Sequence, residues 1–177
     1  MSDRSTILGA IQDRPGGALP IPWPGPTVDG ELVSRFTTEL GILGAEVVSV
    51  DRLSELAGMS VFADEDVPTE FLRGFNRSDQ VWDAEVGMTL ADFAIADTGS
   101  LVLNSGPGRH RLASLAPPHH IAIVARANIL ATSEAAIAAL SARTTVIVTG
   151  PSRTADIEGV IVRGIHGPRT LWVLITG

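Results

Sequence analysis

The sequence predicts an α/β protein with an open, largely parallel sheet and helices on both faces. Two observations carry this prediction. Short apolar runs recur along the second half of the chain, and loops rich in Gly and Pro separate them. A segment with helical character stands among these runs, which is the alternation that builds parallel sheets covered by helices.

The N-terminal part is predicted to hold a short helix and an extended strap. Residues Ser5 to Ile11 can form the helix. Five prolines and three glycines between Pro15 and Pro26 remove backbone donors and break any periodicity, so this stretch is expected to be extended and anchored by Trp23. We therefore divide the chain into residues 1–27 and one α/β domain over residues 28–177, whose length suits a single core.

The predicted elements of the domain follow in chain order. A helix opens at Asp29 and runs to about Leu43, because its apolar residues share one face, and Gly44 ends it. A strand over 45–50, a short helix over 53–58 and an irregular or helical surface over 64–86 come next. Thr132 can cap a later helix over 133–142. The remaining strands are expected at Phe93 to Ala96, Leu101 to Leu103, Ile121 to Ala125, Thr145 to Thr149 and Leu171 to Ile175.

Missing residue types exclude several kinds of chemistry. The 177 residues include no Cys, so disulfides, thiolate metal sites, Cys-ligated iron–sulfur clusters and cysteine nucleophiles are excluded. All 13 basic residues are Arg, which also excludes a Schiff-base Lys and a P-loop Lys. No spacing of His or carboxylates indicates a metal site, and we expect no cofactor.

Charge is distributed unevenly along the chain. Residues 1–97 carry 17 acidic residues and 6 Arg, a balance of −11, and residues 98–177 carry 3 acidic residues and 7 Arg, a balance of +4. The net charge of −7 argues against nucleic-acid binding, whereas the second half favours anions. The apolar stretch 121–140 is interrupted by Arg126 and Glu134, so no membrane span is expected. The N-terminus does not resemble a secretory signal, which predicts a cytoplasmic protein.

Three loops that contain glycine are predicted to bind an anion. They are Asp97 to Ser100, Gly106 to Arg109 and Gly150 to Asp156, and each follows an apolar strand run. Glycine exposes backbone N–H groups, hydroxyls and Arg add donors, and strand ends of parallel sheets converge, so we expect the loops to meet around a phosphate or carboxylate. The candidate ligand-binding residues are Asp97, Thr98, Gly99, Ser100, Gly106, Gly108, Arg109, Gly150, Ser152, Arg153, Thr154 and His166.

Several of these residues have a structural alternative. Asp97 can act as a base or can cap the amides of its own loop. Arg109 and Arg153 can hold an anion or can form ion pairs, with Asp156 and Glu158 as possible partners. Arg153 is favoured as a ligand residue because its loop leads into a predicted helix start, where the dipole attracts anions.

The histidines and the candidate catalytic residues are open to two interpretations as well. The rigid Pro117-Pro118 segment fixes the direction of the side chain of His119. A histidine placed like His166 is more often bonded to a backbone carbonyl than catalytic. The candidates for a catalytic role are Asp97, Glu158 and His119.

Five motifs in order resemble the lactate-utilization protein C family, the single-domain branch of the LUD domain. They are FAIADTGSLV from Phe93, SGPGR from Ser105, PPHHI from Pro117, GPSRTADIE from Gly150 and GIHGPR from Gly164. The resemblance is dense from about Val86 to the C-terminus. The family's first loop is most often Glu-Thr-Gly-Thr, where this chain has Asp97-Thr98-Gly99-Ser100.

The resemblance implies a fold like that of the ribose-5-phosphate isomerase, glucosamine-phosphate deaminase and CoA-transferase superfamily. It also implies a role in oxidising L-lactate to pyruvate together with iron–sulfur partner proteins, and this chain would bind a small carboxylate or phosphorylated ligand. The alternative is a stand-alone enzyme of the sugar-phosphate isomerase or acyl-CoA transferase type, with Asp97 or Glu158 as base. The isomerases of that superfamily use a Lys, which this chain lacks.

Overall fold

The structure, a computed structural model, describes residues 31–140, 144–155 and 161–177. The predicted helix at residues 5–11, the strap at residues 15–26 with Trp23, the boundary after residue 27 and the expected helix start at Asp29 lie outside these ranges. Asp156 and Glu158 lie outside them as well.

The described residues form two α-helices, five 3-10 helices and twelve strands. The helices are α2 (Leu32–Ile42) and α3 (Ser133–Ala139), with η1 (Val50–Leu56), η2 (Thr69–Leu72), η3 (Val81–Asp83), η4 (Arg111–Ser114) and η5 (Arg126–Asn128). The strands are β1 (Glu46–Val47), β2 (Ser60–Ala63), β3 (Asn76–Arg77), β4 (Val86–Leu90), β5 (Phe93–Ile95), β6 (Ser100–Asn104), β7 (His119–Ala125), β8 (Ile129–Leu130), β9 (Thr145–Val148), β10 (Arg153–Ala155), β11 (Ile161–Arg163) and β12 (Thr170–Thr176).

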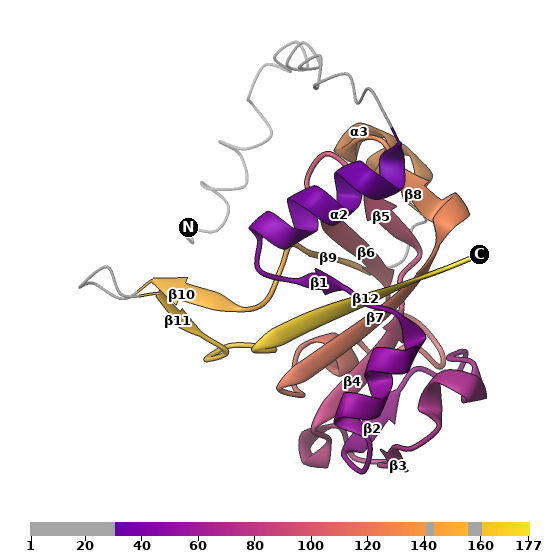
Figure 1. The fold of residues 1–177 in the computed structure, drawn as a ribbon, viewed down its shortest axis with the longest axis vertical. Coiled ribbons are helices and arrows are strands. Elements are labelled where there is room, and N and C mark those ends of the chain that lie inside the picture. Colours follow the sequence, from indigo (N-terminus) through magenta and orange to yellow (C-terminus); the bar gives the residue numbers. More distant parts are fainter. Residues whose placement is uncertain (1–30, 141–143, 156–160) are drawn as a thin grey trace, which may run out of the picture.

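A six-stranded sheet forms the centre of the domain. Its order is β1-β12-β7-β4-β2-β3, and every neighbouring pair is parallel. The pairing of β12 with β7 is the longest, and it runs from Thr170 opposite His119 to Thr176 opposite Ala125 (Figure 1). This sheet confirms the predicted α/β class with a largely parallel sheet.

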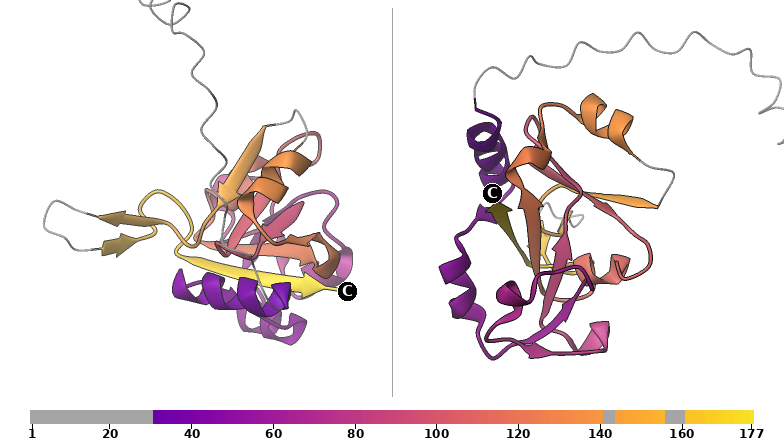
Figure 2. Two further views of the ribbon diagram at one scale, coloured as in Figure 1. Left: turned by 90° about the horizontal axis from the view of Figure 1, so that it is seen from above. Right: turned by 90° about the vertical axis from the view of Figure 1, so that its right-hand side faces the viewer.

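A second sheet has the order β8-β5-β6-β9 and is mostly antiparallel. β6 pairs antiparallel with both β5 and β9, while β5 pairs parallel with β8. Three of the predicted apolar strands therefore belong to this second sheet. A separate hairpin, β10–β11, extends away from both sheets, as Figure 1 and the left view of Figure 2 show.

The two faces of the parallel sheet are covered differently. Side chains of α2 and the second sheet pack on one face, with Phe36, Leu40 and Leu101 fully buried against Ala122 and Val173. The 3-10 helices η1 and η2 cover the other face around Met88, Ile121 and Leu174. α3 packs on the outer side of the second sheet. The second sheet and the 3-10 helices thus take much of the covering role that the sequence assigned to helices.

Local sequence explains where several elements begin and end. Gly44 has a φ of 80°, which ends α2 where the sequence predicted. The Thr132 side chain accepts a hydrogen bond from the Ala135 amide at 3.3 Å, which confirms the predicted cap of α3. The predicted strand over 45–50 is limited to Glu46–Val47. The expected surface segment 64–86 contains short 3-10 helices and β3, and it ends at the start of β4.

Among the described residues, no helix combines the length and the apolar character that crossing a bilayer requires.

Candidate functional site

Two of the three glycine-bearing loops lie together, and the third lies elsewhere. β9 runs antiparallel to β6, with Leu101 opposite Val148. The loop after β9 therefore reaches the turn that precedes β6, and the Ser100 and Thr149 hydroxyls lie 2.8 Å apart. The segment Gly106–Arg109 follows the other end of β6, where the Ser105 amide donates to Thr144 O. The expectation that all three loops meet is wrong. β6 and β9 run antiparallel, so the loops that follow them leave from opposite ends of the strand pair.

The turn Asp97–Ser100 packs tightly against α2. Gly99 has a φ of 64°, and a Cβ there would lie 2.4 Å from the Leu40 amide nitrogen. Thr98 Oγ1 donates to Ser100 Oγ at 2.9 Å, which extends the hydroxyl pair to a chain of three. Asp97 Oδ1 is buried without a hydrogen-bond partner among the described residues. These contacts give the turn a structural role.

The turn Gly106–Arg109 uses its own donors. The Gly106 and Arg109 amides exchange hydrogen bonds with each other's carbonyls at 3.2 and 3.0 Å. The Arg109 side chain donates to Asp66 at 3.0 Å and to Asp92 at 2.9 Å. Burial lowers the pKa of this guanidinium, but the two ion pairs outweigh it and the net shift is upward. Arg109 thus forms ion pairs, with partners other than those expected from the sequence.

The strongest candidate site is a cleft of about 290 Å³ between the parallel sheet and β9, which we call the Ser152 cleft. Its walls come from β9, from the loop that follows it, and from the loop 166–168 that precedes β12. Among the candidate residues it contains Gly150, Ser152, Arg153 and His166. The other lining residues are Ser114, Leu115, His120, Val146, Ile147, Val148, Thr149, Pro151, Gly167, Pro168 and Leu171, and no carboxylate is among them.

Backbone donors are available in the Ser152 cleft. The Ser152 amide donates to Pro168 O at 2.9 Å, and the Gly164 amide donates to Ser152 O at 3.0 Å, so these bonds hold the two loops together. Within the described part of the chain, the amides of Gly150, His166 and Gly167 make no hydrogen bond. As far as the described residues define it, the cleft offers amides without a partner and a serine hydroxyl and has no acidic side chain, which suits an anion.

Arg153 has a position that differs from the expected one. Its loop leads into strand β10 rather than into a helix, so the predicted helix dipole at this point is absent. The guanidinium donates instead to Leu43 O at the C-terminal end of α2, where a cation is favourable. Arg163 is opposite Arg153 in the hairpin and also lies beside Gly44. Arg153 therefore has a structural contact in addition to its place on the wall of the cleft.

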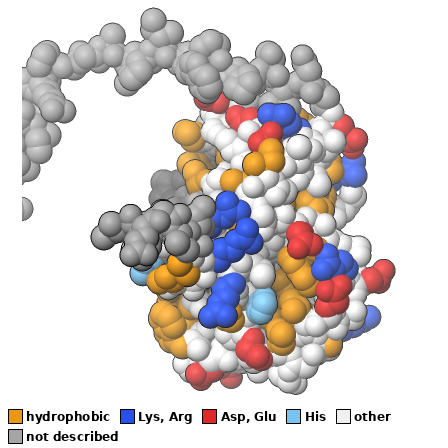
Figure 3. Space-filling model, turned by 60° about the vertical axis from the view of Figure 1, so that its left-hand side comes forward, with side chains coloured by type: hydrophobic (Ala, Val, Ile, Leu, Met, Phe, Trp, Pro, Cys, Tyr) orange, Lys and Arg blue, Asp and Glu red, His pale blue; other side chains and the backbone are white. Residues whose placement is uncertain are grey.

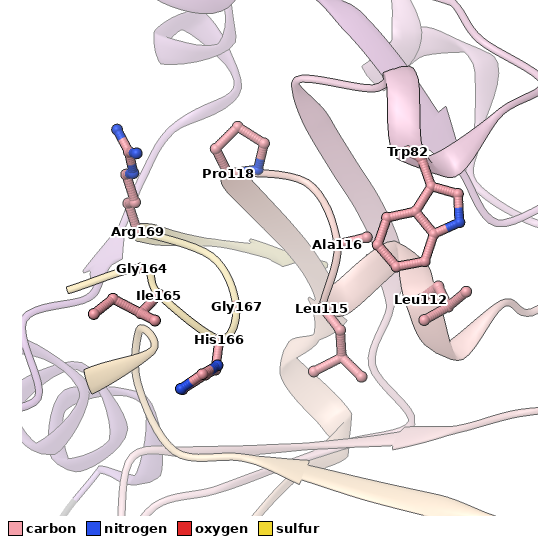
Figure 4. A pocket seen from close by; sticks show the side chains of 10 residues that line it. All are labelled: Trp82, Leu112, Leu115, Ala116, Pro118, Gly164, Ile165, His166, Gly167 and Arg169. Atoms are coloured by element: carbon pink, nitrogen blue, oxygen red, sulfur yellow. The ribbon is translucent and has the colours of Figure 1, made fainter. Parts of the chain in front are cut away.

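A second cleft of about 400 Å³ shares Leu115, His166 and Gly167 with the first. In Figure 4, Trp82 and Leu112 stand on one side of it, and His166 and Arg169 stand on the other. The Arg169 side chain crosses Gly164 and points away from Trp82. Figure 3 shows basic side chains gathered on one face of the molecule, and Arg153, Arg163 and Arg169 are all exposed. The His166–Gly167 turn is thus a wall between two clefts with a positive surface nearby.

The remaining candidates lie outside both clefts. His119 Nδ1 is 2.8 Å from Thr170 Oγ1 at the start of β7 and β12. Thr154 pairs with Val162 in the hairpin. Neither lines the two clefts, and neither does Asp97. Within the described ranges no group of three or more His, Asp or Glu could hold a metal ion.

Among the ionisable residues that line the cleft, His120 is the one that the sequence did not indicate as a candidate. His120 is 1% exposed, and its Nε2 lies 2.9 Å from Thr89 Oγ1. Burial lowers the pKa of its imidazole to about 4. Residues alternate between the faces of a strand, so the second His of the His119-His120 pair points toward the other sheet. This alternation in the His119-His120 pair was the sequence feature that could have indicated His120 as a residue of the cleft.

Comparison with known proteins places the chain in a family. Residues 59–176 match the LUD domain model. The chain belongs to the LUD domain family. A protein named lactate utilization protein C from Deinococcus radiodurans is 30% identical over 98% of this chain and 93% of its own length. Proteins of the same name from Halalkalibacterium halodurans and a Geobacillus species are 35% and 34% identical over 52% and 58% of this chain.

The LUD domain chain spans about half the length of several of these relatives, since the matches cover 44% of the Halalkalibacterium protein and 47% of the Geobacillus protein. A crystal structure of a DUF162 family protein from Deinococcus radiodurans superposes with a TM-score of 0.64 and covers 83% of this chain and 97% of that chain. Its sequence identity is 22%, so it supports the fold alone.

Proposed function

We propose that this LUD domain protein takes part in the oxidation of L-lactate to pyruvate and binds a small carboxylate at the Ser152 cleft. The observation that carries the proposal is the donor set of that cleft. Among the described residues it offers three amides without a hydrogen bond, the Ser152 hydroxyl and His166, and none of the described lining residues is acidic. The names of the relatives support lactate as the substrate of the system.

The lining of the cleft favours a small ligand that is charged at one end. Leu115, Val146 and Leu171 supply apolar surface, while Ser152 and the amides of Gly150 and Gly167 supply donors. A hydrogen bond to a carboxylate is worth about 1.5 to 3 kcal/mol, and two or three of them suffice for a weak metabolite site. Arg153 adds positive charge at the rim with the donors that Leu43 O does not use.

The oxidation itself needs an electron acceptor. The sequence contains no Cys to ligate an iron–sulfur cluster, so in this proposal partner proteins that carry such clusters accept the electrons. The chain then contributes the binding of the small acid, or of its product, within the assembly.

Calorimetric titration of the purified protein with L-lactate, pyruvate and inorganic phosphate tests the binding step. Ser152→Ala and His166→Ala should each weaken binding of the preferred anion about tenfold, which corresponds to about 1.4 kcal/mol. Ser54→Ala is the matched control, because Ser54 is exposed in η1 on the opposite face of the parallel sheet. Equal affinities in all three variants would remove the Ser152 cleft as the site.

Growth of a deletion strain tests the role in lactate use. Loss of the protein should abolish growth on L-lactate and leave growth on pyruvate intact, and the wild-type gene should restore it where Ser152→Ala restores it poorly. Growth of the deletion strain on L-lactate at the parental rate, in a strain with no other lactate oxidase, contradicts the proposal.

A further inference from the structure

The imidazole of His120 is held at one place on the inner face of the parallel sheet. It is the second residue of β7, and its neighbours in register are Gly87 on β4 and Leu171 on β12. Its Nε2 lies 2.9 Å from Thr89 Oγ1, and Thr89 is itself 3% exposed. The ring is therefore buried and oriented by one hydrogen bond.

Gly87 leaves the space that the backbone of η4 fills. A Cβ on Gly87 would lie 1.8 Å from Ala113 O, so no other residue fits without moving η4. Ser114, the last residue of η4, lines the Ser152 cleft together with His120. The backbone of η4 therefore packs close to the sheet beside His120, and the Ser152 cleft lies next to the same imidazole ring.

The second ring nitrogen of His120, Nδ1, has no partner in the described part of the chain. Among the described residues, Nδ1 makes no hydrogen bond, and the Thr89 bond is the one that His120 forms through its side chain. Because His120 lines the Ser152 cleft, Nδ1 is available to a molecule bound there.

This nitrogen suits an uncharged oxygen. Burial keeps the ring neutral at physiological pH, since its pKa is lowered to about 4. The other ionisable residues of the cleft, Arg153 and His166, are exposed. A neutral imidazole has one donor and one acceptor, and the Thr89 hydroxyl can serve as partner to either form. A carboxylate beside the buried ring would lose hydration without a charged partner, so the charged end of a ligand belongs nearer the rim.

We propose that His120 binds the oxygen on carbon 2 of a small 2-hydroxy or 2-oxo acid, whose carboxylate lies toward Ser152 and His166. The inference rests on the proposed function, because it assumes a small carboxylate in the Ser152 cleft. To the proposed function it adds that the cleft prefers acids with an oxygen on carbon 2, and that His120 distinguishes these acids from acids without that oxygen.

The two kinds of acid make different demands on the ring. A 2-oxo group only accepts hydrogen bonds, so pyruvate requires the proton on Nδ1, and Nε2 then accepts from the Thr89 hydroxyl. A 2-hydroxyl can also donate, so L-lactate is compatible with a bare Nδ1. Propionate has no oxygen on carbon 2 and leaves Nδ1 as it is in the free protein.

NMR of protein labelled with ¹⁵N in its four histidine rings separates these cases. Substitution of His110, His119 and His166 by Asn assigns three rings and leaves the fourth to His120. Pyruvate should give the His120 signals of a ring protonated at Nδ1, L-lactate should shift them, and propionate should leave them unchanged and bind about tenfold more weakly. His110, which packs on Phe62 away from the cleft, is the internal control.

The amides of Gly150 and Gly167 report on the proposed function separately. If neither amide responds to any of the three acids, the proposed function fails, and this inference fails with it. If both amides respond and the His120 ring is insensitive to pyruvate, or is protonated at Nε2 in its presence, only this inference is overturned.

A pair of variants tests the hydroxyl that supports the ring. Thr89→Val keeps the shape of the side chain and removes the partner of Nε2, whereas Thr89→Ser keeps the hydroxyl. Thr89→Val should lower the ratio of pyruvate to propionate affinity at least threefold, and Thr89→Ser should retain most of it. An unchanged ratio in folded Thr89→Val overturns the role of His120.

Discussion

Gly99→Ala tests whether the Asp97–Ser100 turn has a structural role or a ligand-binding role. A methyl group at residue 99 would lie 2.4 Å from the Leu40 nitrogen and 2.7 Å from the Glu39 carbonyl carbon, both in the backbone of α2. The backbone of Gly99 also has a φ of 64°, a conformation that L residues rarely adopt. Neither strain can be relieved by rotating a side chain.

The expected loss of stability combines two terms. A residue with a Cβ at positive φ costs about 1 to 2 kcal/mol. Forcing an extra methyl group into a packed contact costs about 1 to 3 kcal/mol. The free energy of unfolding of Gly99→Ala should therefore fall by about 2 to 5 kcal/mol, a large part of the roughly 5 to 15 kcal/mol typical of a domain.

Urea denaturation followed by circular dichroism measures this loss. Gly41→Ala is the matched control, because Gly41 lies in the same helix and a Cβ there would have no atom within 4 Å. That substitution should stabilise the protein by about 0.5 to 1 kcal/mol through helix propensity. If Gly99→Ala unfolds at the same urea concentration as the wild type and only loses affinity for anions, the packing argument is refuted and the turn is a ligand loop.

Two further predictions concern the ionisable side chains of His120 and Arg109. Unfolded His120 takes up a proton near pH 6.5, whereas the folded ring does so only near pH 4, so stability is complete above pH 6.5 and falls by about 3 kcal/mol as the pH drops through this window. The free energy of unfolding is measured against pH for the wild type and for His120→Asn, and the difference between the two curves isolates the contribution of His120. This comparison removes the effect of Asp64, whose raised pKa acts in the opposite direction. A difference that does not change with pH would contradict the prediction. Arg109→Ala should lower the free energy of unfolding by about 1 to 2 kcal/mol, because Asp92 loses its partly buried partner, and should leave pyruvate affinity at the wild-type value in calorimetry. A drop in affinity without destabilisation would return Arg109 to the binding site.

Sequence periodicity predicted α2, α3 and the five apolar strands from Phe93 onward, because these depend on local features. The apolar face of α2, its end at Gly44 and the cap at Thr132 are set by neighbours within a turn or two. β4 was missed because Gly87 and Thr89 interrupt its apolar run. Both residues are explained by tertiary contacts, which the local sequence does not show. Gly87 accommodates Ala113 O and Thr89 bonds His120, and both contacts join residues distant in sequence.

The sequence predicted only some of the residues that line the candidate site, because strand pairing is also a tertiary property. Apolar runs indicate strands but not their direction, so the expectation that strand ends converge failed for Gly106–Arg109. The four residues between Ile95 and Ser100 include Gly99, which is typical of a hairpin connection and would have indicated the antiparallel pairing of β5 and β6. The GPSR and IHGP motifs do lie in one cleft, because two backbone hydrogen bonds join their loops.

The short outer strands of the parallel sheet limit how this protein can associate with others. β1 and β3 contribute two residues each, and both carry a charged side chain, Glu46 and Arg77. An incoming strand would find only a short row of backbone groups at either border, which disfavours growth of the sheet from one molecule into the next. Association through the parallel sheet should therefore use its side-chain surfaces, and mutations that disrupt such contacts should map to its faces and loops rather than to β1 or β3.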